Sequence, residues 1–174
     1  ITNGVGWTFE AEVVIPNHNK CVMNIQSSKY TQPKDYSVHL AVSPTKMNDR
    51  YEWFLEKATE IGVTVITPII SHNSERKVVK TERFEKIIQS AMKQSLHPYL
   101  PSLEAAVTFS EFIKKPQEGK TFIAHCDKGE KLKFKNQVEP GKSITILIGP
   151  EGDFSNQEIA TAMENNYIPV SLGN

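Results

Sequence analysis

The sequence predicts an α/β fold built on a mainly parallel sheet, and three observations support this prediction. From residue 38 onward, short apolar runs alternate with segments of helical periodicity. The run 144–148 carries no charge, as a strand covered on both faces requires. Hydrophobic residues make up 39% and charged residues 23% of the 174 positions, which is typical of a globular domain. No apolar run reaches the roughly 20 residues that a membrane-spanning helix needs.

The first part of the chain has a different texture. Residues 7–15 and 21–26 are short, alternating segments rich in β-forming residues, with the turn sequence PNHNK between them. They predict an antiparallel hairpin that forms the end of a small β domain. The polar stretch 27–36 contains a proline and is interpreted as a linker. We therefore divide the chain into residues 1–34, the β part and its linker, and residues 35–174, the α/β domain.

Within the α/β domain, residues 38–43, 64–70, 121–126, 144–149 and 168–173 are the predicted strands. The first helix is expected to start at a cap on Asn48 or Asp49 and to end at Gly62. The second is expected to start at a cap on Thr81 and to end near His97, because the next residue is a proline.

Two further helices follow. A short one is predicted to open at Thr108 or Ser110. The last covers residues 157–165 and follows a clear start signal: Ser155 and Glu158 have capping-box spacing, and residues 154 and 159 are apolar at the two staple positions.

The loop GPEGD after the run 144–148 is the strongest candidate for a binding site. Gly149 and Gly152 can adopt φ > 0 and leave room for a ligand near the backbone, and Pro150 stiffens the turn. A second glycine segment, SLG, ends the last strand. Two such loops suit an adenine and ribose held by main-chain hydrogen bonds at the carboxyl edge of a sheet. The alternative from pattern alone is an ordinary strand-to-helix connection.

Other motifs are weaker. The tripeptide 141–143, GKS, precedes a strand and lacks the first glycine of a P-loop, and no GxGxxG occurs. His125, Cys126 and Asp127 are interpreted as a strand end with a buried thiol, although His125 could line a ligand pocket. Cys21 and Cys126 form no CxxC pattern and are expected to be reduced thiols of a cytoplasmic protein. The five histidines show no metal-ligand spacing, so we expect no metal.

The formal net charge is zero, but the charges are unevenly placed. Cations exceed anions in the segment 75–93, and again in a cluster of Lys128, Lys131, Lys133 and Lys135 opposed by Glu130. Each cluster is either a solvated face or a footprint for a phosphate backbone.

The segments 43–76, 90–101, 147–159 and 170–173, taken together, resemble the bacterial ribosomal RNA small-subunit methyltransferase E family. The resemblance covers essentially the whole chain in order. It implies an S-adenosylmethionine-dependent methyltransferase that acts on N3 of a uridine in 16S ribosomal RNA of the small ribosomal subunit. It further implies a SPOUT-type domain with a C-terminal trefoil knot, a preceding PUA-like β-barrel of which this sequence holds the remnant, a homodimer and no membrane association.

The resemblance also implies site residues. The adenosine of the donor would be gripped by backbone at Ile148, Gly149, Pro150, Glu151, Gly152, Leu172 and Gly173. RNA contacts are expected at Lys46, Arg50, Arg76, Lys93 and Gln94, through phosphate charge and polar hydrogen bonds. The sequence identifies no catalytic base for the uridine N3 proton.

Three departures from the family pattern stand out. Asp153 replaces a frequent glycine, and His97 stands where an arginine is common. The family continues after SLG with an Arg-x-Leu-Arg-x-Glu-Thr-Ala segment, whereas this sequence ends at Asn174, so we expect a truncated knot and an incomplete, inactive donor site. Two alternatives stay open: a non-catalytic RNA-binding module, and another SPOUT RNA methyltransferase.

Overall fold

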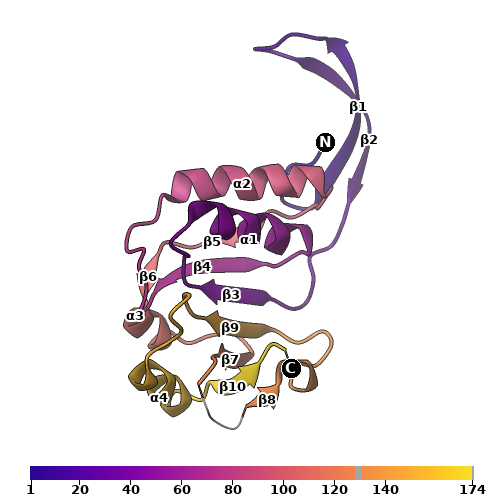
Figure 1. The fold of residues 1–174 in the computed structure, drawn as a ribbon. Coiled ribbons are helices and arrows are strands. Elements are labelled where there is room, and N and C mark those ends of the chain that lie inside the picture. The colour runs from indigo at the N-terminus through magenta and orange to yellow at the C-terminus, as the bar shows by residue number, and fades with distance from the viewer. Residues whose placement is uncertain (128–130, 174) are drawn as a thin grey trace.

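A computed structural model describes residues 1–127 and 131–173. Figure 1 shows a two-stranded hairpin that projects from an α/β body. The hairpin pairs β1 (Trp7–Ile15) with β2 (Val22–Tyr30) in antiparallel fashion, as predicted. The pairing continues to Trp7 opposite Tyr30, so residues 27–30 belong to a strand and the predicted linker is shorter than expected. Hydrogen bonds from the Gly6 amide to Pro98 and from Tyr99 Oη to Thr31 attach the base of the hairpin to the body.

The prediction of a mainly parallel sheet is confirmed. In the described part of the chain the sheet has eight strands, and every pair in it is parallel. Its order is β5 (Ser102–Leu103), β4 (Val65–Ile70), β3 (Val38–Val42), β9 (Ile144–Ile148), β7 (Lys120–Ala124), β10 (Ile168–Ser171) and β8 (Leu132–Lys133), with β6 (Val107–Thr108) also paired to β4. The uncharged run 144–148 therefore lies in the middle of the sheet.

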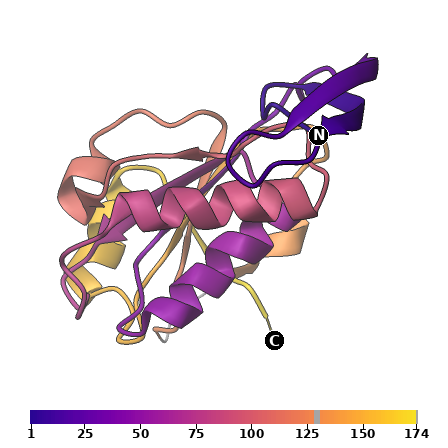
Figure 2. The same ribbon diagram turned by 90° about the horizontal axis from the view of Figure 1, so that it is seen from above.

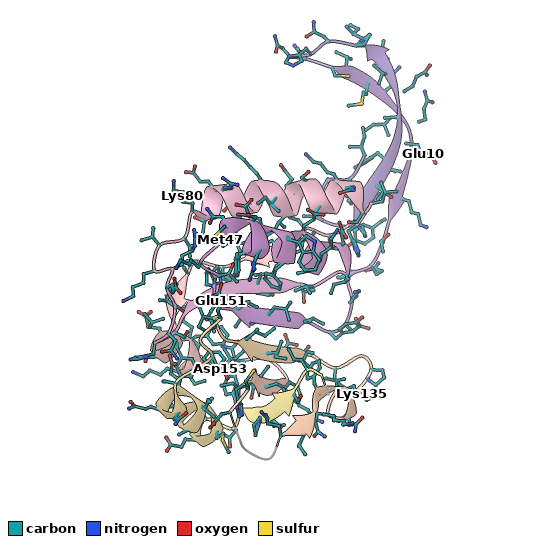
Figure 3. The ribbon with its side chains drawn as sticks, viewed as in Figure 1. Glu10, Met47, Lys80, Lys135, Glu151 and Asp153 are labelled. Atoms are coloured by element: carbon teal, nitrogen blue, oxygen red, sulfur yellow. The ribbon has the colours of Figure 1, made fainter. Side chains whose placement is uncertain are left out.

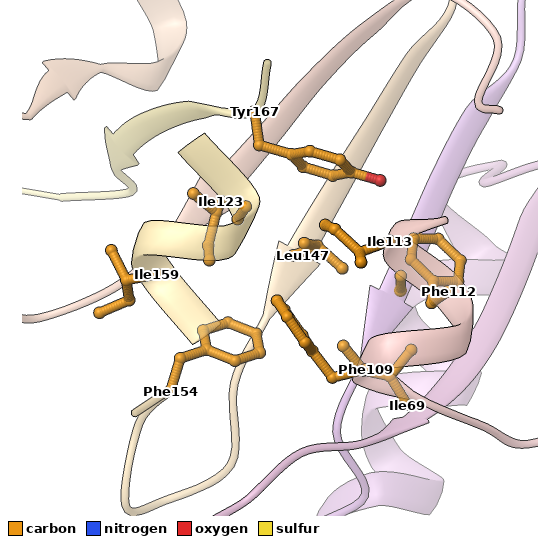
Figure 4. Packing of buried hydrophobic residues seen from close by; sticks show 11 residues of the cluster. Ile69, Phe109, Phe112, Ile113, Ile123, Leu147, Phe154, Ile159 and Tyr167 are labelled. Carbon is orange, nitrogen blue, oxygen red and sulfur yellow. The ribbon is translucent and has the colours of Figure 1, made fainter. Parts of the chain in front are cut away.

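Helices cover both faces of this sheet. The helices α1 (Asn48–Glu60) and α2 (Thr81–Gln94) pack against β3 and β4 on one face, where Tyr51, Leu55 and Phe84 are buried. Figure 2 shows these two helices crossing over the strands. The helices α3 (Phe109–Ile113) and α4 (Asn156–Glu164) cover the other face (Figure 4). Side chains alternate between the two faces along a strand. Leu147 therefore packs in the core under α3 and α4, whereas Ile146 packs in a core on the other face of the sheet, near the 3₁₀ turn Phe134–Asn136.

The helix starts were predicted with mixed success. Thr108 caps α3 and Ser155 caps α4 through complete capping boxes, as expected. The caps expected at Asn48 or Asp49 and at Thr81 are wrong. Asn48 and Thr81 are the first residues inside α1 and α2, not the residues before them. Met47 and Lys80 therefore occupy the cap positions, and neither makes a side-chain hydrogen bond there. Burial of the inner faces of α1 and α2 against each other and the sheet replaces the cap as the stabilising term.

Three helices end in the same way, with a residue at positive φ after the last turn. These residues are Gly62 after α1, Leu96 after α2 and Asn166 after α4, with φ of 84°, 56° and 64°. In each case the next amide reaches back to the helix, as in Val63 N to Ala58 O at 3.0 Å, which is the Schellman pattern. Among the described residues, no helix has the length and apolar character to span a bilayer.

Candidate functional site

The carboxyl ends of β3, β4, β9, β7 and β10 lie along one edge of the sheet, because all these strands are parallel. The loops that follow them meet there, and Figure 3 shows Met47, Glu151 and Asp153 on this side of the molecule. Open parallel sheets bind their ligands at this edge. The GPEGD loop, residues 149–153, extends from the central strand β9 and is therefore surrounded by the other loops.

The conformation of the loop differs from the expectation. Neither Gly149 nor Gly152 adopts a positive φ; Asp153 does, at 60°. The glycines are needed for close packing instead. A Cβ on Gly149 would lie 3.2 Å from the ring and the amide nitrogen of Phe154, and a Cβ on Gly152 would lie 3.3 Å from Cβ of Asn73. The turn itself is closed by a hydrogen bond of 2.9 Å from Asp153 N to Pro150 O.

Three contacts anchor the GPEGD loop to neighbouring loops. A carboxylate oxygen of Glu151 accepts from the Lys46 amide in the loop after β3, at 3.1 Å. Nδ2 of Asn73, in the loop after β4, donates to the carbonyl oxygens of Gly152 and Asp153 at 3.0 and 3.1 Å. The Asp153 carboxylate accepts from the Cys126 amide after β7 at 2.6 Å. Such a loop presents its remaining main-chain groups in fixed directions, which suits recognition by backbone hydrogen bonds.

The predicted donor-binding residues fall on two loops. Pro150 is buried, and Ile148 and Gly149 are half-buried, whereas Glu151, Gly152, Leu172 and Gly173 are exposed. The two loops follow β9 and β10, which are separated by β7, so they stand two strand spacings apart, or roughly 10 Å. A Cβ on Gly173 would meet nothing within 4 Å. The space beside this residue is therefore open to a ligand.

His125 lies between these two loops, at the end of β7, and was predicted only as a side chain that could line a pocket. Both of its ring nitrogens are shielded from solvent and have no hydrogen-bond partner among the described residues, although the side chain as a whole is half-buried. Burial, and secondarily the charge of Lys131, lower the pKa of His125, which favours a neutral ring. A neutral imidazole offers one donor and one acceptor, and the described part of the chain uses neither.

The neighbouring thiol corrects another expectation. The strand β7 ends at Ala124, so Cys126 lies outside it and is exposed rather than buried. Nζ of Lys131 holds this segment by donating to the carbonyl oxygens of His125 and Asp127, at 3.1 and 2.7 Å. One cation of the second basic cluster is thus engaged by the backbone, while Lys128 and Glu130 of that cluster lie outside the described residues.

The predicted RNA-contacting residues do not form one surface. Lys46, Arg50 and Arg76 lie near the GPEGD loop, but two of them are engaged within the protein. Arg76 donates to the carbonyl oxygens of Thr45 and Lys46 at 3.1 and 2.7 Å and so supports the loop after β3. Lys46 pairs with Glu75 at 2.8 Å, and this contact raises the pKa of Lys46. Arg50 is exposed on the first turn of α1.

Lys93 and Gln94 lie at the far end of α2, beside the hairpin. Lys93 lines a cavity of about 580 Å³ together with Phe9 and Lys29 of the hairpin. Since α2 has 14 residues, these two side chains stand about 20 Å from its start near the GPEGD side. The nearby His97, a departure from the family pattern, binds the carbonyl oxygen of Glu60 through Nε2 at 2.8 Å and joins α1 to α2.

No group of three or more His, Cys, Asp or Glu side chains suited to a metal ion occurs among the residues that the structure describes.

The fold and the candidate site define an α/β domain with an anchored main-chain loop at the carboxyl edge of a parallel sheet, where a ligand could bind. A family model described as an RNA methyltransferase domain matches residues 32–174.

The most informative relatives agree with that match. The chain is 28% identical over 174 residues to the ribosomal RNA small subunit methyltransferase E of Rickettsia conorii, covering 98% of this chain and 70% of the relative. The crystal structure of a probable rRNA-methyltransferase from Porphyromonas gingivalis is similar with a TM-score of 0.89 and 36% identity, over 99% of this chain and 74% of that one. The ribosomal RNA small subunit methyltransferase E of Neisseria gonorrhoeae, bound to S-adenosyl methionine, has a TM-score of 0.86 and 26% identity, over 99% and 73%.

The chain belongs to the RNA methyltransferase domain family and, within it, to the ribosomal RNA small-subunit methyltransferase E family. The resemblance stated from the sequence motifs is confirmed.

Proposed function

We propose that this chain carries the donor site of a methyltransferase that uses S-adenosylmethionine to methylate N3 of a uridine in 16S ribosomal RNA. The anchored GPEGD loop, which lies at the same sheet edge as the end of β10, is the observation that supports this most directly. The similar protein of Neisseria gonorrhoeae binds S-adenosyl methionine.

The residues present fit such a donor. Backbone groups of residues 148–152 would hold its adenosine from one side, and Leu172 and Gly173 would hold it from the other, where the space beside Gly173 is open. The ring nitrogens of His125, for which residues 1–127 and 131–173 supply no partner, lie between the two loops. The donor supplies an already electrophilic methyl carbon, so the protein contributes mainly orientation and exclusion of water. We assign no base for the N3 proton.

The whole protein is expected to have further structural features beyond the donor site. We propose a C-terminal trefoil knot, a PUA-like β-barrel to which residues 1–34 contribute the hairpin, and a homodimer in the cytoplasm that acts on the small ribosomal subunit. The family match beginning at residue 32 supports the division into residues 1–34 and 35–174. Exposed apolar side chains on the hairpin, among them Val13, Ile15 and Ile25, support its packing within a larger β domain.

Calorimetric titration with S-adenosylmethionine tests the donor site. We expect 1:1 binding by the full-length protein and loss of binding in Gly173→Val, because a Cβ at this position enters open space, with no protein atom within 4 Å. Gly149→Val is unsuitable as a site probe because it also presses on the buried Phe154. Normal donor binding by Gly173→Val would refute the assignment of the second loop.

Methyl transfer from labelled donor to small ribosomal subunits tests the reaction. Nuclease digestion and mass spectrometry of the RNA should locate the label as N3-methyluridine in 16S RNA. Methylation at another atom or in another RNA would favour a different RNA methyltransferase. Tight RNA binding without donor binding would favour the non-catalytic module.

A further inference from the structure

Asp153 has a conformation and a set of contacts that the donor-binding residues do not share. Its φ of 60° is a region that side chains with a Cβ disfavour, although Asp tolerates it better than most. One carboxylate oxygen accepts from the Cys126 amide at 2.6 Å, and the other accepts from the amide of Phe154 at 2.8 Å. Its carbonyl oxygen accepts from Asn73 at 3.1 Å. The residue is therefore held in its unusual backbone conformation by several contacts.

The contact with Cys126 joins two adjacent loops. Asp153, labelled in Figure 3, closes the GPEGD loop after β9. Cys126 belongs to the segment 125–127 after β7, which carries His125. Lys131 holds the same segment through the carbonyl oxygens of His125 and Asp127. The segment thus has one charged contact from Asp153 and another from Lys131. It stands between the GPEGD loop and the end of β10.

We propose that Asp153 is a positioning residue for the methyl donor: its carboxylate fixes the GPEGD loop relative to the segment 125–127 and so sets the geometry of the pocket. This inference rests on the proposed function. The contacts of Glu151 and Asn73 tie the loop toward β3 and β4, whereas the contact of Asp153 ties it toward β7 and β10. A ligand held by backbone groups from both β9 and β10 depends on that spacing. Charge-assisted hydrogen bonds to a carboxylate are strong enough to maintain it.

Two substitutions separate the carboxylate from the backbone conformation. Asp153→Gly keeps the positive φ without strain and removes the contact with Cys126. Asp153→Asn keeps a carbonyl oxygen for the Cys126 amide and is well tolerated at positive φ. Asn166→Gly is the matched control, since Asn166 also has a positive φ, of 64°, but lies before β10, at the opposite edge of the sheet.

In the full-length protein, we expect Asp153→Gly to weaken S-adenosylmethionine binding about tenfold by calorimetry, with the KM for RNA unchanged. Asp153→Asn should stay within about threefold of the parent, and Asn166→Gly should bind like the parent. Hydrogen exchange at the Cys126 amide reports the contact itself. It should be slow in the parent protein and faster in Asp153→Gly, with the Tm of the variant close to that of the parent.

Equal donor affinity of Asp153→Gly and the parent would overturn the inference while leaving the proposed function intact. Rapid exchange at the Cys126 amide of the parent would overturn it as well. A large drop in Tm of Asp153→Gly that accounts for its lost binding would show a role in folding only. Absence of donor binding by the parent is a different result: it refutes the proposed function, and the inference with it.

Discussion

Tyr167 places its hydroxyl group in the apolar core. Its side chain is 4% exposed and packs in the core beneath α3 and α4, near Leu147 and Ile113 (Figure 4). Its hydroxyl has no hydrogen-bond partner in the part of the chain that the structure describes, and burial raises the pKa of Tyr167 to about 12. A buried hydroxyl without a partner costs free energy that a phenylalanine avoids.

We therefore expect Tyr167→Phe to leave the free energy of unfolding unchanged or to raise it by about 1 kcal/mol. Tyr51 provides the matched comparison, because its buried hydroxyl donates to Val42 O at 3.2 Å. Tyr51→Phe should lower the free energy of unfolding by about 1 kcal/mol. Urea unfolding of both variants measures the difference, and a marked loss in Tyr167→Phe would contradict the prediction.

Two histidines make stability depend on pH. Burial lowers the pKa of His39, opposed by contacts with Gln117 and Glu104, and burial also lowers the pKa of His125. In each case the unfolded chain binds a proton more readily than the folded one. Stability is therefore fully present above the unfolded value near 6.5 and falls as the pH drops toward the lowered folded values.

We expect the Tm to fall between pH 7 and pH 5, before the carboxylates titrate. Glu111 and Glu139 have lowered pKa values as well, but their contribution is lost only below about 4.5. In His39→Gln the amide can replace the 2.8 Å contact with Thr67 without titrating, so the fall should be smaller. A variant with the same pH profile as the parent would exclude His39 as a source.

At the scale of elements, the end of α2 is a site of stored strain. Leu96 occupies the position after the helix that requires positive φ, with φ of 56°, and its side chain is 76% exposed. The hydrogen bond from His97 N to Met92 O, at 3.1 Å, shows that the Schellman motif forms nonetheless. The left-handed region costs residues other than glycine about 1–2 kcal/mol, and little packing offsets that cost at an exposed leucine.

Leu96→Gly should therefore raise the free energy of unfolding by about 1 kcal/mol, as measured by urea unfolding. Leu96→Ala is the control, because alanine retains the Cβ and should give no comparable gain. Equal stabilisation by both variants would mean that loss of the exposed leucine, and not relief of the backbone, is responsible.

The positions of helices and strands could be predicted from the sequence where short-range patterns determine them. The capping box of Ser155 and Glu158 and the uncharged run of β9 are such patterns, and both were read correctly. The starts of α1 and α2 were not, because packing against the sheet sets them. The positive φ of Asp153 was also missed, since it follows from contacts with Cys126 and Asn73, which are distant in the sequence.

At the scale of the whole molecule, the predicted RNA contacts separate into a group near the donor site and a group near the hairpin. The order of the strands in the sheet decides which of these residues lie close together. No local sequence pattern specifies that order. The same reason explains why a structural role of Arg76 was not predicted. Its guanidinium supports the loop at Thr45 and Lys46, on a different connection of the sheet.

Arg50 and Arg76 should therefore behave differently when replaced. We expect Arg50→Ala to keep the Tm of the parent and to weaken RNA binding, with the slope of log affinity against log salt reduced by about 1. Arg76→Ala should lower the Tm and weaken donor binding, because the loop bonded to Glu151 loses its support. Filter binding across salt concentrations, together with thermal unfolding, distinguishes the two. An unchanged Tm in Arg76→Ala would contradict this supporting role.

The position of β9 between β3 and β7 also has a consequence during synthesis. The contact between Lys46 and Glu151 joins residues 105 apart in the sequence, and Ser37 meets Ser143 across 106. A ribosome that adds about 5–20 residues per second needs on the order of 5–20 s to make the intervening chain. During that time the apolar edge of β3 that later receives β9 has no partner, and such an edge is prone to aggregation. The nascent chain therefore passes through an interval in which this edge is exposed, and the GPEGD loop can bond to the loop after β3 only once β9 has been made.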